Sequence, residues 1–172
     1  MLLEIIKIIF RFILLVAVQV IVLNNIRLGG YVNPYIYVLF IMMLPVRIPK
    51  TLLLVIAFAT GLCIDVFSNT QGLHAAASVF LGFIRPTVLR IIAPRDGYEA
   101  DASPSIKLMG VSWFILYSVI AVFLHHMVLF YVEVFRFSEF FSTLLRVALS
   151  SVVTIIFILI SQLLFGKTID NR

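Results

Sequence analysis

One acidic residue, Asp65, lies inside an otherwise apolar stretch of the sequence. An ionisable side chain in such a stretch is costly to place in lipid, so it is a candidate for function. The stretch begins at Thr51, and at helical rise Asp65 lies about 21 Å further along. Near the end of a helix, its carboxylate is suited to accept hydrogen bonds from the first N–H groups of the following helix. We favour this capping role, and a proton or ion site remains the alternative.

Arg85 and Pro86 are the second unusual feature, because they interrupt another apolar stretch. Arg85 precedes Ile92 by about 10 Å of helix, so its long side chain is expected to extend towards the nearer membrane surface. Pro86 leaves the carbonyl of Gly82 without its helical N–H partner, and an arginine beside it is a candidate donor. Asp65 and Arg85 lie towards opposite membrane faces, so no direct ion pair is expected between them.

The three histidines give no catalytic or metal-binding pattern. His74 follows Asp65 closely enough for a hydrogen bond, and His125 and His126 are expected to pack near a membrane interface. The single cysteine, Cys63, excludes an intrachain disulfide and a cysteine-based metal cluster. No serine-nucleophile, phosphate-loop or zinc-protease motif occurs. The sequence therefore predicts a protein that is not an enzyme, with no catalytic residue, metal or cofactor.

The composition indicates a membrane protein. Of the 172 residues, 63% are hydrophobic and only 12% are charged, and the mean hydropathy is +1.18. These values exclude a disordered chain, a secreted disulfide scaffold and, in practice, a water-soluble enzyme. The formal charge is +5, but no Lys/Arg-rich run occurs, so no nucleic-acid partner is expected. Basic residues on the cytoplasmic side of a membrane explain the excess.

The apolar stretches predict an all-α integral membrane protein, folded as one domain of residues 1–172 with six transmembrane helices. Each span needs about 20 largely apolar residues. The second stretch is short, and it reaches a spanning length only if it begins near Tyr31 or if the membrane is locally thin. The expected spans are residues 8–28, 31–46, 51–67, 73–92, 108–131 and 143–165.

The distribution of Lys and Arg predicts that both termini are cytoplasmic. Six spans in this orientation place 10 of the 13 basic residues on the cytoplasmic side, in agreement with the positive-inside rule; they are Lys7, Arg11, Arg47, Lys50, Arg85, Arg90, Arg95, Lys107, Lys167 and Arg172. A five-span arrangement, in which residues 31–46 only dip into the membrane, places 9 of the 13 there and stays open.

Two further segments are candidates for packing or for partner binding. The span that begins at residue 73 is rich in small residues, which allow membrane helices to approach closely. Residues 131–142 are rich in phenylalanine and carry Glu133, Arg136 and Glu139 at a spacing that predicts a shared helical face. This second segment is expected to lie at the outer membrane interface, against headgroups or a partner helix.

The order of these features resembles that of the rod shape-determining protein MreD family. The most specific part is residues 61–77, G-L-C-I-D-V-F-S-N-T-Q-G-L-H-A-A-A, and residues after 107 match mainly in hydropathy. In this motif, Gly61 is expected to permit close packing, Asp65 to end its helix, and Gly72 with Ala76 to seat the next helix tightly. The structural or partner-binding candidates are Gln19, Asn24, Pro34, Gly61, Asp65, Gly72, His74, Ala76, Arg85 and Pro86; Tyr35 and Pro45 belong to the same pattern.

The resemblance implies a non-enzymatic scaffold in the bacterial cytoplasmic membrane. Members of the family are understood to bind the single-span protein MreC. The pair connects MreB filaments, indirectly, to a RodA-type SEDS glycosyltransferase and a class B penicillin-binding transpeptidase. The family fold is similar to that of the six-helix S components of ECF transporters. The alternative function is therefore a small-solute-binding subunit of such a transporter, with polar residues such as Asn25 and Asn69 beside the candidates above.

Overall fold

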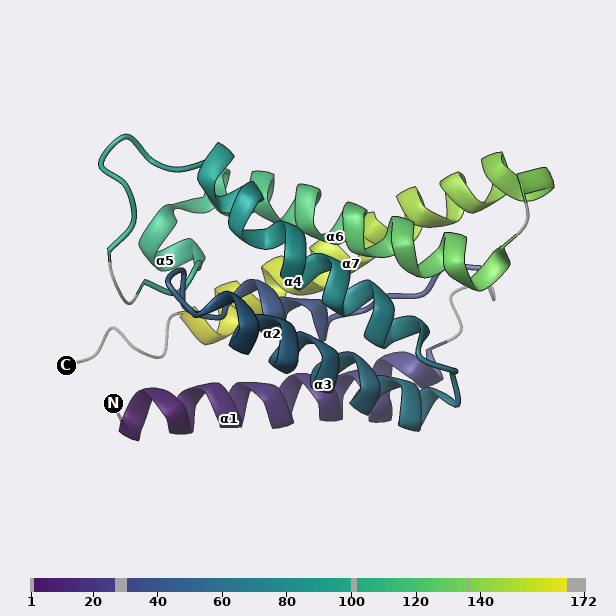
Figure 1. The fold of residues 1–172 in the computed structure, drawn as a ribbon, viewed down its shortest axis with the longest axis horizontal. Helices are drawn as coiled ribbons and strands as arrows, with labels where there is room; N and C mark the ends of the chain where they lie inside the picture. Colours follow the sequence, from purple (N-terminus) through teal and green to yellow (C-terminus); the bar gives the residue numbers. More distant parts are fainter. Residues whose placement is uncertain (1, 27–30, 100–101, 136, 167–172) are drawn as a thin grey trace.

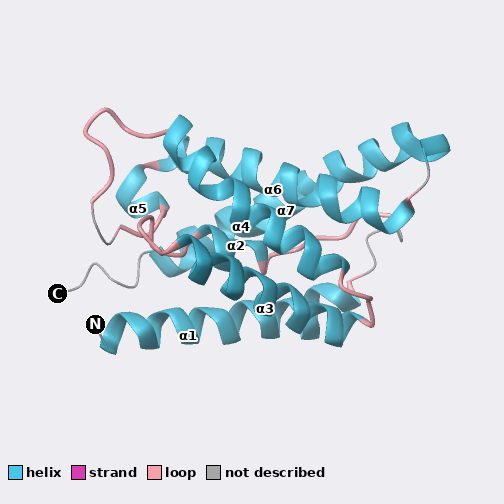
Figure 2. Cartoon of the chain, viewed as in Figure 1, coloured by secondary structure: helices cyan, strands magenta, loops and turns pink. Residues whose placement is uncertain are grey.

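The computed structural model describes residues 2–26, 31–99, 102–135 and 137–166. Every regular element among them is helical (Figure 2). In chain order they are α1 (Leu2–Ala17), a π-helical turn (Val18–Val22), a 3-10 turn (Leu23–Asn25), α2 (Val38–Met42), α3 (Lys50–Ser68), α4 (Leu73–Ile91), α5 (Ile106–Met109), α6 (Val111–Val134), a second 3-10 turn (Phe137–Glu139) and α7 (Phe140–Gly166).

Four of these segments are long and apolar enough to cross a membrane: Leu2–Asn25, Lys50–Ser68, Val111–Val134 and Phe140–Leu164. The helix α4 is as long as α3, at 19 residues, but it carries Arg85, Pro86 and Arg90. At about 1.5 Å per residue, helices of this length extend about 28 Å. The fold is thus all-helical and compatible with an integral membrane protein.

The helices form a bundle in which α4 packs against both α3 and α6, and α6 packs against α7. The turn that joins α3 to α4, residues 69–72, lies at the same end of the bundle as the end of α1 and the end of α6 (Figure 1). We call this the hairpin end. The opposite end, which we call the N-terminal end, holds the start of α1 and residues 92–99 and 102–110.

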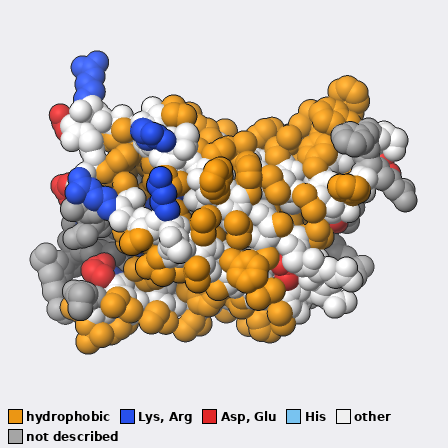
Figure 3. Space-filling view, viewed as in Figure 1, with side chains coloured by type: hydrophobic (Ala, Val, Ile, Leu, Met, Phe, Trp, Pro, Cys, Tyr) orange, Lys and Arg blue, Asp and Glu red, His pale blue; other side chains and the backbone are white. Residues whose placement is uncertain are grey.

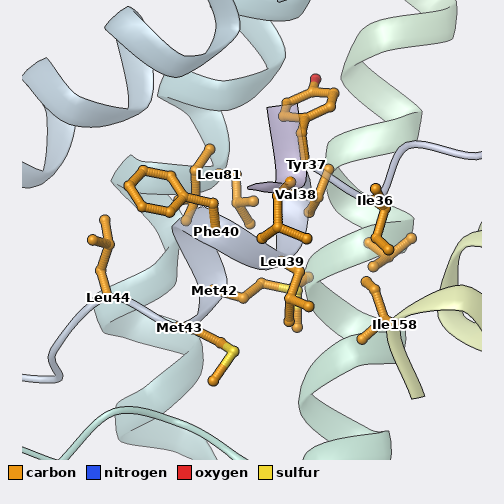
Figure 4. Close-up of a cluster of buried hydrophobic side chains, with 14 of the residues drawn as sticks. Ile36, Tyr37, Val38, Leu39, Phe40, Met42, Met43, Leu44, Leu81 and Ile158 are labelled. Carbon is orange, nitrogen blue, oxygen red and sulfur yellow. The ribbon is translucent and has the colours of Figure 1, made fainter. Parts of the chain in front are cut away.

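Residues 31–46 do not form the continuous helix predicted for the second span. Only α2 is helical, and residues 31–37 approach it as non-helical chain through the bundle (Figure 1). The whole of α2 is buried among side chains from the longer helices, such as Leu81 and Ile158 (Figure 4). Among the described residues, the bundle therefore has five long helical segments around this short one, and not six long helices.

The proline in this segment explains why the helix begins late. Pro34 has no N–H, and the N–H groups on either side of it bond to α7 instead of to a helical turn. Asn33 donates its backbone N–H to Ser150 Oγ at 3.1 Å, and Tyr35 donates its own to Thr154 Oγ1 at 3.0 Å. Inside a membrane, non-helical backbone is tolerated only where protein groups satisfy it in this way.

At the N-terminal end, one hydrogen bond joins two loop segments and another joins two helix ends. Val46 donates its N–H to the carbonyl of Ala102 at 2.9 Å, which joins the chain after α2 to the loop before α5. Trp113 Nε1 donates to the carbonyl of Ile92 at 2.7 Å, so the start of α6 satisfies the end of α4.

The phenylalanine-rich segment does not form one helical face. The helix α6 ends at Val134 because Phe135 adopts a left-handed conformation, with φ of 44°. Glu133 and Glu139 therefore lie on different elements, and Arg136 lies outside the described residues. Phe135 is 87% exposed and Phe141 is also exposed, and the position at the outer membrane interface stays a prediction.

Large apolar side chains are exposed on all five long helices, including Ile9 on α1, Val55 on α3, Phe83 on α4 and Val152 on α7. On the face shown in Figure 3, hydrophobic side chains cover the middle of the bundle, and Lys and Arg gather towards the N-terminal end. An apolar belt of this extent is unusual for a monomer in water, and it suits contact with lipid.

Candidate functional site

The Asp65 carboxylate caps the α3–α4 turn. Asp65 is only 2% exposed. Its Oδ1 accepts hydrogen bonds from the backbone N–H of His74, at 3.0 Å, and from Thr70 Oγ1, at 2.5 Å. Its Oδ2 accepts the backbone N–H of Ala75, at 2.9 Å. The acid at the end of α3 thus satisfies the free N–H groups at the start of α4, where the helix dipole also favours a negative charge. This is the capping role predicted for Asp65.

The backbone of the same turn adopts left-handed conformations that its residues tolerate. Asn69 ends α3 with φ of 55°, and Gly72 precedes α4 with φ of 84°. Asparagine and glycine accept this region more readily than other residues. A Cβ on Gly72 would meet no atom within 4 Å, so the reason for glycine here is the conformation and not the packing predicted for it.

The close approach between α3 and α4 occurs at Gly61. A Cβ on Gly61 would lie 2.5 Å from the Cα of Ala75, a distance that backbone atoms cannot accommodate. The close packing predicted for Gly61 is therefore present, although its neighbours are His74 and Ala75. Ala76 is exposed, so its predicted packing role in this contact is wrong.

The end of α1 is tied to the turn by a chain of side-chain amides. Gln19, which is fully buried, donates from Nε2 to Asn24 Oδ1 at 2.9 Å and to the carbonyl of Pro34 at 3.1 Å. Asn24 Nδ2 then donates to Ser68 Oγ, at 3.1 Å, on the last turn of α3. Gln19 lies in the π-helical turn, a local irregularity often associated with functional positions. Residues far apart in the sequence are thereby joined at the hairpin end.

A buried ring network extends from this end into the bundle. The Tyr37 hydroxyl lies 3.0 Å from His74 Nδ1 and 2.8 Å from His125 Nε2. Since a hydroxyl has one proton, it donates to one imidazole and accepts from the other. His126 Nε2 lies 3.2 Å from Thr154 Oγ1 on α7. Both His125 and His126 are fully buried inside the bundle, and the packing near a membrane interface stays a prediction.

Arg85 lies inside the bundle rather than at its surface. It is 1% exposed, so the predicted extension towards the membrane surface is wrong. Its guanidinium donates to the carbonyls of Met42, at 3.2 Å, and Leu44, and its Nε donates to the Tyr117 hydroxyl at 3.1 Å. Met42 is the last residue of the short helix α2 and Leu44 follows it, so these carbonyls have no helical partner and a buried cation is well placed there. The Tyr117 hydroxyl also donates to the Met42 carbonyl, at 3.1 Å. The predicted bond to the Gly82 carbonyl is replaced by this contact with α2.

Pro86 lies within α4 directly after Arg85, and α4 remains helical on both sides of it. Pro45, which belongs to the same MreD-like sequence pattern, contributes its carbonyl as a further acceptor for Arg85, at 3.4 Å. The hydrogen-bond partners of Asp65 and Arg85 lie in different parts of the chain, as expected for two groups that do not form an ion pair.

A polar hollow of about 440 Å³ lies at the hairpin end. It is lined by the end of α1, the non-helical segment before α2, the α3–α4 turn, and the ends of α6 and α7. A smaller hollow of about 180 Å³ adjoins it, and Arg146 lines both. Within the described part of the chain, no group of three or more His, Cys, Asp or Glu side chains is placed to hold a metal ion.

Sequence reasoning missed the partners that organise these residues. Tyr37, Tyr117 and Thr154 form hydrogen bonds with His125, Arg85 and His126, respectively, which were already noted in the sequence. Their only signal was their presence as hydrogen-bonding side chains in apolar stretches, which many membrane helices share.

Comparisons with protein-family models, with curated proteins and with solved structures each find no match to this chain.

Proposed function

We propose that this chain is an integral membrane scaffold of the bacterial cell-elongation machinery, of the kind represented by the MreD family. In this proposal it binds a single-span MreC-like protein in the cytoplasmic membrane. Through that partner it helps to position a RodA-type glycosyltransferase and a class B penicillin-binding transpeptidase, with MreB filaments connected indirectly. The bundle would then act by holding partners in place and not by chemistry of its own.

The observation that carries the proposal is that the residues of the sequence pattern are bonded to one another in space. Gln19 bonds to Asn24 and to Pro34, and Asn24 reaches the end of α3. Asp65 fixes the start of α4, including the backbone of His74. A pattern made only of local turn signals would give no reason for these long-range bonds. A frame whose elements are joined by such bonds is what a scaffold requires.

The charges support an orientation with the N-terminal end in the cytoplasm. Basic residues at or near that end include Lys7, Arg47, Lys50, Arg90 and Arg95, whereas Arg146 lies at the hairpin end. This asymmetry follows the positive-inside rule. In the same proposal, residues 31–46 cross the membrane as non-helical chain and α2, which with the five long helical segments makes six crossings.

The polar hollow favours a second candidate, the solute-binding subunit of an ECF-type transporter. Its volume falls in the range of about 300–1,000 Å³ that is usual for small-molecule sites. Such a subunit would associate with an ATPase module through a coupling protein. The two functions therefore predict different partners for the same bundle, and partner identity separates them.

The experiment is affinity capture of the tagged chain from its native cells in a mild detergent, followed by mass spectrometry. Asp65→Ala and Asp96→Ala are captured beside the wild type at matched expression, since Asp96 is an exposed loop acid. The scaffold proposal expects a single-span MreC-like protein and wall synthases with the wild type and with Asp96→Ala, and less of them with Asp65→Ala. Recovery of an ATPase module and a coupling protein would instead establish the transporter function.

A further inference from the structure

We propose that the polar hollow at the hairpin end binds an uncharged, hydroxyl-rich group, namely the sugar headgroup of a glycolipid. This inference goes beyond the scaffold function and does not depend on it. The hollow of about 440 Å³ is far larger than the space that one buried water needs, about 10–15 Å³. Its size therefore suits an organic group of several hydrogen-bonding atoms.

Several polar groups that line the hollow have no hydrogen-bond partner within the part of the chain that the structure describes. His74 is 3% exposed, and its Nδ1 is held by Tyr37, but its Nε2 is unpartnered. The Tyr35 hydroxyl and the side-chain amide of Asn33 are also unpartnered, although the backbone N–H groups of both residues are bonded to α7. None of these three groups is fully enclosed, so each is accessible from the hollow and free to bond a ligand there.

The charges of the lining favour a ligand without net charge. Glu133 and Arg146 line the hollow and pair with each other, at 3.2 Å and 3.3 Å. The Arg146 guanidinium is also held 4.2 Å from the centroid of the Phe130 ring. A net cation would compete with Arg146 for Glu133, and a net anion would compete with Glu133 for Arg146. The buried Arg146 Nε has no hydrogen-bond partner in the described chain, and a hydroxyl oxygen can accept from it without adding charge.

The hydroxyl groups of a sugar match the uncharged polar groups that line the hollow. Each hydroxyl donates one hydrogen bond and accepts others, so a sugar can serve an imidazole nitrogen, a phenol and an amide at once. An apolar ligand would remove water from these groups without replacing its hydrogen bonds, at a substantial cost. The hollow lies where the long helices end, at the level expected for lipid headgroups. That position favours a sugar carried on a lipid over a free sugar.

The test is native mass spectrometry of the purified full chain in tetraethylene glycol monooctyl ether, a detergent whose headgroup is not a sugar. The probes are diglucosyl diacylglycerol, phosphatidylethanolamine and phosphatidylglycerol with the same acyl chains, and free maltose. We expect diglucosyl diacylglycerol to bind at least about tenfold more tightly than either phospholipid. Maltose competition would show that the free sugar also enters, whereas its absence would assign the site to lipid-linked sugar. Both results support the proposal.

Two variants locate the binding. Tyr35→Phe and Asn33→Ala each remove one ligand hydrogen bond, so each should weaken glycolipid binding roughly two- to tenfold. Thr87→Ala, near the other end of α4, should leave it unchanged. The hydroxyl removed from Tyr35 makes no protein hydrogen bond, so the melting temperature of Tyr35→Phe should equal that of the wild type.

Two results would overturn the proposal. One is equal or tighter binding of either phospholipid, which would indicate a charged headgroup bound at Glu133 and Arg146. The other is glycolipid binding that both variants leave intact. Neither result would alter capture of a single-span partner, so a failure here is distinct from a failure of the scaffold function.

Discussion

Replacing Asp65 with alanine should destabilise the bundle more than any other single loss of an acid. The change removes the acceptor for two backbone N–H groups at the start of α4 and for the Thr70 hydroxyl. The carboxylate is buried, so little water is available to replace it. The turn would keep its backbone path but would carry unpaired donors in a site of low polarity.

The size of the effect follows from these bonds. A hydrogen bond to a charged group contributes about 1.5–3 kcal/mol, and a buried donor left unpaired costs about 1–3 kcal/mol. These terms overlap, and together they give a loss of about 3–5 kcal/mol, at the upper end of the range for single substitutions. For a chain of this length, about 2–4 °C per kcal/mol corresponds to a melting temperature lower by roughly 6–20 °C. Asp65→Asn keeps one acceptor oxygen, so its melting temperature should lie between those of the wild type and Asp65→Ala.

The assay is thermal unfolding in a mild detergent, followed by the helical signal in circular dichroism. Asp96→Ala is the control, because it also removes an acid but from an exposed loop. If Asp65→Ala and Asp96→Ala melt at the same temperature, the carboxylate does not hold the start of α4, and the reasoning for the hairpin end is refuted.

The same assay tests five further substitutions, two of which are controls. Gly61→Ala should lower stability by about 3 kcal/mol or more, because its Cβ meets backbone, whereas Gly82→Ala meets only a side-chain methyl at 3.1 Å and should cost about 1 kcal/mol. Arg85→Met should cost about 3–5 kcal/mol, since the Leu44 carbonyl loses its donor and the Met42 carbonyl keeps only the Tyr117 hydroxyl; Arg90→Met, on an exposed position, should change stability by less than about 0.5 kcal/mol. Tyr37→Phe should cost about 1–3 kcal/mol, because two buried imidazoles lose their shared hydroxyl.

Each of these three predictions has an outcome that would contradict it. Equal losses for Gly61→Ala and Gly82→Ala would mean that the hairpin can open at no cost. A melting temperature for Arg85→Met near that of Arg90→Met would mean that the α2 carbonyls find other donors. A melting temperature of Tyr37→Phe equal to that of the wild type would show that the two imidazoles do not depend on the hydroxyl.

The capping role of Asp65 was predictable because it depends on local chemistry. An acid followed within nine residues by a new helix start can reach the free N–H groups across one short turn. The close contact at Gly61 was predictable for a related reason, since small residues allow helices to approach. In both cases the sequence separation is short, and few alternative partners are within reach.

The positions of Arg85, His125 and His126 were not predictable from helix position alone. Depth along a helix gives the distance from the membrane surface, but it does not say which side of the helix faces the bundle. Arg85 faces inwards because the buried end of α2 presents carbonyls that, as at the end of any helix, have no intrahelical donor. That cause lies about 40 residues away in the sequence, and hydropathy does not report it.

The second apolar stretch shows a different limit. Its hydropathy is that of a buried segment, and hydropathy does not distinguish a helix from non-helical chain that other helices cover. The acceptors that hold the backbone around Pro34 are Ser150 and Thr154, near the other end of the sequence. Only the packed bundle brings these hydroxyls to the N–H groups that the proline leaves without a helix.

The central claim, that the bundle holds a single-span partner, is tested most directly in a bilayer. The purified chain and the MreC-like protein of the same organism are reconstituted in vesicles with donor and acceptor fluorophores, and energy transfer is measured as lipid is added. The account predicts transfer that persists on dilution and exceeds that with an unrelated single-span helix. Transfer that falls with dilution to the level of the unrelated helix would contradict it.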